Sequence, residues 1–426
     1  MIQQRILSFK LKKTTSTLTS HAGLALLGEF VHGLQVGNLV DKFMPRPRSN
    51  RGFKASTYVY PLLLMLHGGG RSLEDIREIR FDKGLHKLLS LKKIPSSDAF
   101  GNWLRRMGDN GGLYGLLRMS RSILHKGMKR DGIKGYTLDI DATGIEAEKF
   151  EAKRTYKGFK GYMPILGHIS ENGMVLGDEF REGNDSPGAR NLAFLKHCEA
   201  QLPKGKKIKY FSSDSAAYQG DIIDYCIDNG MEFAIGADLD QAVVELINEI
   251  PGKNWREYKD GKISETVHTM NNNRYSFRLI VISRAYQGDV FGDVDARSKY
   301  RVIATNRTER SEEVVEWYNQ RSDKSENRIK ELKIGFSMER MPCGQFKANA
   351  VFFRIGVIAY NLYKLFLNNV LDKSWKKHQV QTIRWRIYQK AGKIVSHAGQ
   401  IALKINEHLY ELFERIRFRA WEFVMG

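Results

Sequence analysis

The chain has 426 residues, a net charge of +20 at pH 7 and an isoelectric point near 9.6. This length allows two or three domains with hydrophobic cores, and the charge favours a polyanionic partner over a small acidic metabolite. The cysteines Cys198, Cys226 and Cys343 form no CxxC pair, which argues against a disulfide framework and a structural zinc site. No signal-peptide pattern or membrane-length apolar run is evident, so we expect a cytoplasmic protein with no membrane partner.

Residues 1–130 are predicted to form a helical DNA-binding region. Apolar residues recur there at intervals of three and four, as on one face of a helix. Ser96 is a plausible N-cap for a helix that carries Trp103, Arg105 and Arg106. This helix could be the second helix of a helix-turn-helix. An ordinary amphipathic helix with a solvated basic face fits the spacing equally well.

From about residue 131 the pattern changes to that of strands. The predicted strands and helices, in chain order, are strand 135–142, strand 162–169, strand 174–181, helix 189–201, strand 207–212, helix 218–229 and strand 231–236. The Asn-Gly pair at 172–173 favours a hairpin between the second and third strands. Three meandering strands followed by helix, strand, helix and strand is the order of a ribonuclease-H-like α/β core, a mixed sheet with helices.

The rest of the chain interrupts and then completes this core. The predicted parts are 131–239, the first part of the catalytic core; 240–310, a β-rich insertion; 311–371, the second part of the core; and 372–426, a basic C-terminal tail.

Three acids occupy separate elements of this predicted core. Asp141 and Asp214 end strand-like runs, and Glu326 lies in a helical segment rich in basic residues. Three carboxylates on separate elements can share two divalent cations, and two cations can drive in-line displacement at a phosphodiester. The phosphates of the substrate would be bound by the basic residues around the third acid, Arg321, Arg328, Lys330 and Lys333.

Other interpretations of these acids stay open. Asp139 and Asp141 are two residues apart on one strand and point to the same face, so either could be the first acid; we favour Asp141, which is nearer the end of the strand. Asp323 and Glu326 have the spacing of a capping box, which would give Glu326 a structural role. Asp214 could also cap a helix or turn.

With these residues in view, the chain resembles the DDE-type transposases of bacterial insertion sequences. It is most similar to the group with a β-strand insertion between the second Asp and the Glu and a Tyr-Arg-Glu-Lys signature. The resemblance covers roughly 135–370 and rests on three motifs, Leu138–Thr143, Ser213–Tyr218 and Tyr318–Lys333.

The resemblance implies a function and a set of site residues. Asp141, Asp214 and Glu326 would be catalytic ligands of Mg²⁺ or Mn²⁺, and Tyr318 and Lys333 would contact DNA. The partners would be double-stranded DNA, as terminal inverted repeats and as target, and a second copy of the chain, forming a homodimer on DNA in a bacterial cytoplasm. The competing functions are a related nuclease or resolvase without strand transfer, and a non-catalytic DNA-binding regulator.

Arg321 matches the Arg of the signature with one departure. Four residues, rather than the commoner three, separate it from Glu326. In a straight helix this spacing turns the two side chains about 140° apart. We therefore expect either that the helix begins after Arg321 or that it contains a bulge.

Overall fold

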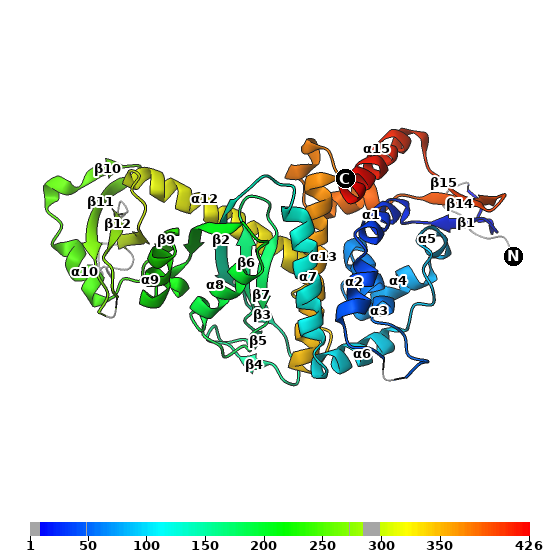
Figure 1. Cartoon of the computed structure of the whole chain (residues 1–426), viewed down its shortest axis with the longest axis horizontal. Helices are drawn as coiled ribbons and strands as arrows, with labels where there is room; N and C mark the ends of the chain where they lie inside the picture. Colours follow the sequence, from blue (N-terminus) through cyan, green and yellow to red (C-terminus); the bar gives the residue numbers. More distant parts are fainter. Residues whose placement is uncertain (1–8, 48, 272, 284–298) are drawn as a thin grey trace.

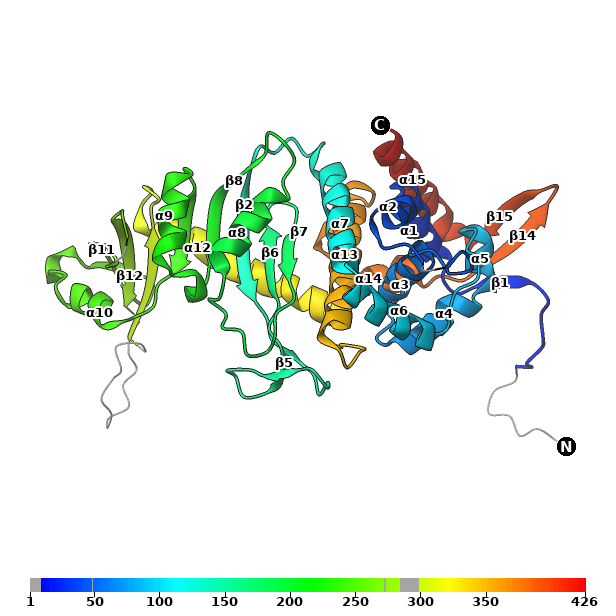
Figure 2. The ribbon, with the colours of Figure 1, turned by 60° about the horizontal axis from the view of Figure 1, so that its bottom comes forward.

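The computed structural model describes residues 9–47, 49–271, 273–283 and 299–426. The molecule is elongated: a helical body lies at one end, the mixed sheet lies in the middle, and the insertion extends the other end (Figure 1). The first described strand, β1 (Thr17–Thr19), and the C-terminal helix, α15 (Glu407–Met425), both lie at the helical end (Figure 2).

The N-terminal region is helical, as predicted. Its elements are β1 (Thr17–Thr19), α1 (Ala22–Gly33), α2 (Val36–Phe43), α3 (Ser56–Gly68), η1 (Leu73–Asp75), α4 (Ile76–Phe81), α5 (Lys83–Leu88), α6 (Ser97–Asp109) and α7 (Gly112–Met128). Trp103 of the expected capped helix α6 is 2% exposed and stacks on Tyr58, with ring centroids 4.9 Å apart. Trp103 therefore belongs to the hydrophobic core, and α6 is amphipathic with Arg105 on its exposed side.

The main sheet contains the predicted core. Its first strands and helices are β2 (Gly135–Ala142), β6 (Ile165–Ile169), β7 (Val175–Glu179), α8 (Asn191–Ala200), β8 (Lys207–Ser213), η2 (Ser215–Ala217), α9 (Gly220–Asp228) and β9 (Glu232–Gly236). The strand order is β7-β6-β2-β8-β9, in which β2, β8 and β9 are parallel and β6 and β7 are antiparallel to their neighbours. This is the ribonuclease-H-like arrangement, so the predicted fold class is confirmed.

A smaller sheet and the insertion complete this part of the molecule. The small sheet, in the order β3-β5-β4, consists of β3 (Ile145–Glu146), β4 (Lys153–Arg154) and β5 (Lys160–Tyr162). The insertion contains α10 (Gln241–Asn248), η3 (Gly252–Asn254), β10 (Arg256–Tyr258), β11 (Gly261–His268), β12 (Phe277–Ser283) and β13 (Tyr300–Thr305). Because β13 pairs antiparallel with β9, the insertion strands continue the core sheet rather than forming a separate one.

Two long helices follow the insertion. They are α12 (Ser311–Lys330), which continues into a π-helical turn, η4 (Glu331–Gly335), and α13 (Phe346–Asn369). We expected no apolar run of membrane-spanning length. Among the described residues, α13 is the one helix long and apolar enough to cross a membrane. However, 94% of its most apolar window is buried inside the protein. It lies between the core sheet and the N-terminal helices, so its apolar character is that of a core helix (Figure 2).

The segment expected as a basic tail is folded. It contains η5 (Lys373–Lys377), α14 (Val380–Ile383), η6 (Arg384–Tyr388), β14 (Gly392–His397), β15 (Gln400–Lys404) and α15 (Glu407–Met425). Strand β14 pairs with β1, and α15 lies against α1 (Figure 1). The buried guanidinium of Arg384 donates to the carbonyl oxygens of Leu66 and His67 at 2.7 and 2.8 Å. These contacts join the C-terminal segment to the N-terminal helices in one body.

Candidate active site

Asp141 and Asp214 lie at the carboxyl ends of two neighbouring parallel strands. Asp141 is the penultimate residue of β2, and Asp214 directly follows β8. The register pairs Ile140 with Ser213, which brings the two acids that follow these residues to the same edge of the sheet. The Asp214 carboxylate also accepts a hydrogen bond from the backbone N–H of Ala216 at 3.2 Å, so its capping interpretation is correct as well.

Asp141 has an unusual electrostatic environment. Burial raises the pKa of its carboxyl to about 7; Arg321 opposes this rise, while the carboxylates of Asp214 and Asp139 add to it. Desolvation and like charges both penalise the ionised form, and a bound cation would relieve both. Strongly shifted pKa values are common at functional sites, because buried acids with a structural role usually have enough positive charge or hydrogen bonds nearby to stabilise the ionised form.

Asp139, unlike Asp141, is inaccessible to solvent. Its side chain is fully buried, and the Nε atom of Arg321 donates a hydrogen bond to Asp139 Oδ1. The Asp141 side chain, in contrast, is 25% exposed, and a terminal nitrogen of Arg321 lies 4.0 Å from Asp141 Oδ2. The accessible acid of the pair is therefore Asp141, which supports its choice as the first acid.

A cavity of about 570 Å³ opens beside Asp141. Its wall carries residues from β2, from α12 and from the π-helical turn. The lining residues are Asp141, Ala142, Thr143, Arg321, Glu326, Ile329, Lys330, Lys333, Ile334 and Glu339. The structure thus brings the first and third predicted acids to one cavity, together with two of the predicted phosphate-binding lysines.

The capping-box interpretation of Glu326 is wrong. Helix α12 runs without interruption from Ser311 to Lys330, so Asp323 lies inside the helix and not at its N-terminus. Both expected explanations of the long spacing are also wrong, because the helix neither begins after Arg321 nor contains a bulge before Glu326. Arg321 and Ser325 lie on the buried side of α12, while the Glu326 side chain is exposed at the cavity.

The remaining predicted DNA contacts occupy different environments. Tyr318 is 5% exposed and donates its hydroxyl hydrogen to the carbonyl oxygen of Ser213 at 3.1 Å. Lys333 is half-buried on the π-helical turn, and its Nζ donates to the Gly144 carbonyl at 2.7 Å. Lys330 is exposed at the rim of the cavity. Arg328 lies outside this cavity and donates to the carbonyl oxygen of Ser170 at 2.7 Å.

Comparison with known proteins decides the family. The family model described as transposase DDE domain group 1 matches residues 4–416. The chain belongs to this DDE transposase family. A comparison with curated protein sequences gives no match. Among solved structures, the chain is similar to a cryo-EM structure of the piggyBac transposase synaptic complex with hairpin DNA, with 10% identity and a TM-score of 0.48 over 86% of this chain and 79% of that one.

The donor atoms of this DDE transposase suit a hard divalent cation, since all three predicted acids offer carboxylate oxygen. Among the described residues, no three Asp, Glu, His or Cys side chains are close enough together to hold an ion in this conformation. Asp141 and Asp214 interact electrostatically, and Glu326 faces the same cavity as Asp141. A three-acid site therefore requires the Glu326 carboxylate to lie closer to Asp141 and Asp214 than it does in this conformation.

Two polar residues of the transposase cavity, Thr143 and Glu339, were not among the predicted site residues. Thr143 follows β2, and Glu339 follows the π-helical turn. The Glu339 carboxylate favours the protonated form of Lys333, although burial of Lys333 has the larger effect and lowers its pKa. Thr143 stood within a recognised motif, but no pattern in the sequence marked Glu339.

Proposed function

We propose that this chain is a metal-dependent transposase that cleaves the ends of its insertion sequence and joins them to target DNA. The observation that carries the proposal is the meeting of Asp141 and Asp214 at the ends of two adjacent parallel strands, beside a cavity that Glu326 and two lysines also line. Acids arranged this way on separate elements can bind cations at a phosphodiester, and the raised pKa of Asp141, caused by burial and by the neighbouring carboxylates, is of the kind found at functional sites.

Asp141, Asp214 and Glu326 would hold Mg²⁺, with Mn²⁺ as a substitute. When bound, these ions would supply activation of the attacking oxygen and charge stabilisation on the leaving oxygen. The family does not require ATP for this chemistry, because one phosphodiester is exchanged for another. The cavity also carries Arg321, Lys330 and Lys333, so positive charge for the phosphates lies beside the acids that would hold the metal.

The basic residues would bind and orient the DNA. The exposed Lys330 at the cavity rim is suited to a phosphate, and Lys333 is directed at the loop after β2 through its bond to Gly144. Arg321 would contact the DNA. It would also stabilise the ionised acids, because its guanidinium forms an ion pair with Asp139 and lies close to Asp141. Tyr318 would hold the end of β8 through the Ser213 carbonyl.

The proposed partners are duplex DNA, first as the terminal inverted repeats and then as target, and a second copy of the chain on DNA in the cytoplasm. The net charge of +20 supports a polyanionic partner. The test is a nicking and joining assay with a duplex that carries the terminal repeat found beside the reading frame. Mg²⁺-dependent nicking followed by joining of the 3′ end to a second duplex is expected. Nicking without joining would indicate the nuclease or resolvase, and neither reaction would indicate a DNA-binding regulator.

A further inference from the structure

The hairpin of β14 and β15 projects from the helical body as a two-stranded ribbon. Strand β1 pairs only with the base of β14, from Gly392 to Ile394. Beyond that base the two strands continue to a two-residue turn, Ala398–Gly399, in which both residues have positive φ, 49° and 79°. This is the tight turn that suits twisted hairpins. At about 3.3 Å per residue, the paired part of the ribbon is roughly 15 Å long.

The two faces of the ribbon differ in chemistry. Directly opposite residues in an antiparallel pair share one face. One face consists of three pairs, Lys393 with Lys404, Val395 with Ala402, and His397 with Gln400. The other face carries Ile394 opposite Leu403 and Ser396 opposite Ile401. Ile394 is 5% exposed, so the base of the apolar face is packed on the protein, whereas both lysines, His397 and Gln400 are exposed.

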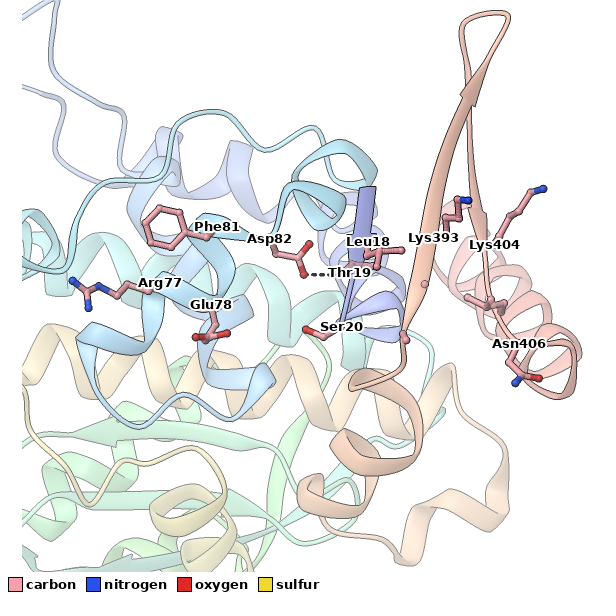
Figure 3. Close-up of a pocket in the computed structure, with 13 residues that line it drawn as sticks. Leu18, Thr19, Ser20, Arg77, Glu78, Phe81, Asp82, Lys393, Lys404 and Asn406 are labelled. Atoms are coloured by element: carbon pink, nitrogen blue, oxygen red, sulfur yellow. Dashed lines mark hydrogen bonds between the residues drawn. The ribbon is translucent and has the colours of Figure 1, made fainter. Parts of the chain in front are cut away.

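The paired lysines are unfavourable for the ribbon on its own. Like charges directly opposite on a sheet destabilise the pair. Residues 389–406 contain no Asp or Glu, and among the described residues neither Lys393 nor Lys404 forms an ion pair with an acid elsewhere. Figure 3 shows both lysines extending from the two strands of the ribbon. An anionic partner would turn this repulsion into favourable binding.

More positive charge gathers around the base of the ribbon. The segment that leads into β1 carries exposed Lys10, Lys12 and Lys13, and residues 9–20 contain no acid. Lys393 and Lys404 also line an open groove of about 820 Å³ whose opposite wall carries Arg77 and Phe81. Figure 3 shows the ribbon rising on one side of this groove and Arg77 and Phe81 on the other. Glu78 and Asp82 in this groove are its acidic members, and Asp82 is already bonded to Thr19 and to the N-terminus of α5.

We propose that the β14–β15 ribbon lies in a groove of duplex DNA and contacts the element's end away from the cleavage site. This inference rests on the proposed function and assigns to it a second DNA-binding surface. The major groove of B-form DNA admits a two-stranded β-ribbon. Lys393 and Lys404 bind phosphates, and Gln400 and His397 at the tip reach base edges, since Gln pairs with adenine through two hydrogen bonds. The ribbon lies at the helical end of the molecule, away from the central strand β2 that carries Asp141 (Figure 1), so it sets affinity and not the chemical step.

The experiment measures DNA binding by the full chain without divalent metal, which separates it from cleavage. The probes are a duplex with the terminal repeat and a duplex of random sequence and equal length. We expect K393Q/K404Q to raise the Kd for both about tenfold at low salt and to lower the slope of log Kd against log salt by about 2, near 0.9 for each lost phosphate contact. Its melting temperature should be unchanged or higher, because the repulsive pair is gone.

The matched control is K204Q/K207Q. This variant removes the same charge from two exposed positions, Lys204 just before β8 and Lys207 at its first residue, at the end of the strand opposite Asp214. It should leave the Kd within about twofold. Gln400→Ala should reduce the preference for the terminal repeat over the random duplex without changing the salt slope, because it removes a base contact and no charge.

Each outcome supports or overturns the ribbon assignment. Equal losses of DNA affinity in the ribbon and control variants would show that only the net charge matters, and would overturn the ribbon assignment. Normal DNA binding by K393Q/K404Q would also overturn it. Loss of self-association with normal DNA affinity would identify the ribbon as a protein interface and would also overturn it. If the wild-type chain binds DNA through the ribbon but does not nick it in Mg²⁺, the proposed function fails and the ribbon assignment stands.

Discussion

Arg321 donates a hydrogen bond from Nε to the carboxylate of Asp139 in the protein interior, and this contact joins helix α12 to the central strand β2. Both side chains are nearly or fully buried. A terminal nitrogen of Arg321 also bonds the Ile140 carbonyl at 3.3 Å. The pair therefore fixes the helix that carries Glu326 relative to the strand that carries Asp141.

Breaking this pair should destabilise the fold. Asp139→Asn leaves the buried guanidinium without its counter-ion, and we expect a loss of about 3–5 kcal/mol in the free energy of unfolding, measured in urea. The double variant D139N/R321M should lose less than the sum of the two single variants, because neither charge remains. Additive losses would show that the two residues do not stabilise each other. At temperatures where D139N is folded, it should still nick DNA.

Lys333→Ala should reduce cleavage more than it reduces stability. The loss of the bond to Gly144 costs about 1 kcal/mol, whereas a misplaced phosphate at the scissile bond can cost on the order of 100-fold in rate. The measurement is the single-turnover nicking rate at limiting DNA together with the melting temperature. Lys324→Ala is the control, because Lys324 is exposed on α12, which leads into the turn that carries Lys333, and lies outside the cavity. Normal nicking by K333A would remove Lys333 from the DNA-contact set.

Tyr318→Phe separates a positioning role from a DNA contact. Tyr318→Ala is uninformative, because removing a large buried side chain would itself cost about 3–5 kcal/mol. The phenylalanine variant loses only the hydroxyl bond to Ser213 and should be destabilised by about 1 kcal/mol. If Tyr318 positions Asp214, nicking should slow while DNA affinity stays constant. An affinity loss with normal nicking of bound DNA would instead indicate direct contact with DNA.

The order of strands and helices along the core and the placing of Asp141 and Asp214 at strand ends were predictable, because each depends on local pattern. Alternating or continuous apolar residues identify the strands, and acids at strand ends are visible without tertiary information. The continuous helix α12 was not predictable: Asp323 and Glu326 have the spacing of a cap, and only packing of the buried face around Ser325 against the sheet extends the helix through them.

Contacts between segments far apart in the sequence could not be predicted either. Asp139 and Asp141 differ in accessibility because Arg321, 182 residues away from Asp139, covers one and leaves the other open to the cavity. The segment after 372 looked like a basic tail because its lysines and arginines dominate its composition. Its structure depends on pairing with β1 and on the burial of Arg384 against the end of α3, which no local pattern reveals.

Metal-free stability should depend on pH through Asp141. The pKa of this carboxyl is about 7 in the folded chain and near 3.8 when unfolded. Because the folded pKa is the higher one, the unfolded state loses its proton first as pH rises from about 4 to 7, and stability falls over that range by at most about 4 kcal/mol. Asp141→Asn should reduce this fall and raise the melting temperature at pH 8 in EDTA.

Mg²⁺ at pH 8 should restore part of this stability in the wild type. Asp141→Asn should lose that response, because one ligand charge is absent. The comparison needs melting curves in EDTA and in Mg²⁺ for both proteins. An equal Mg²⁺ response in D141N would place the ion elsewhere.

The central claim, that Asp141, Asp214 and Glu326 act together in strand cleavage, is tested most directly by Mg²⁺-dependent nicking of a terminal-repeat duplex. Asp141→Asn, Asp214→Asn and Glu326→Gln keep size and remove one charge each, so each should abolish nicking and leave the Kd for DNA nearly unchanged. Glu316→Gln, an exposed acid on the same helix as Glu326, should nick at the wild-type rate. A Glu326→Gln protein that nicks normally would contradict the claim.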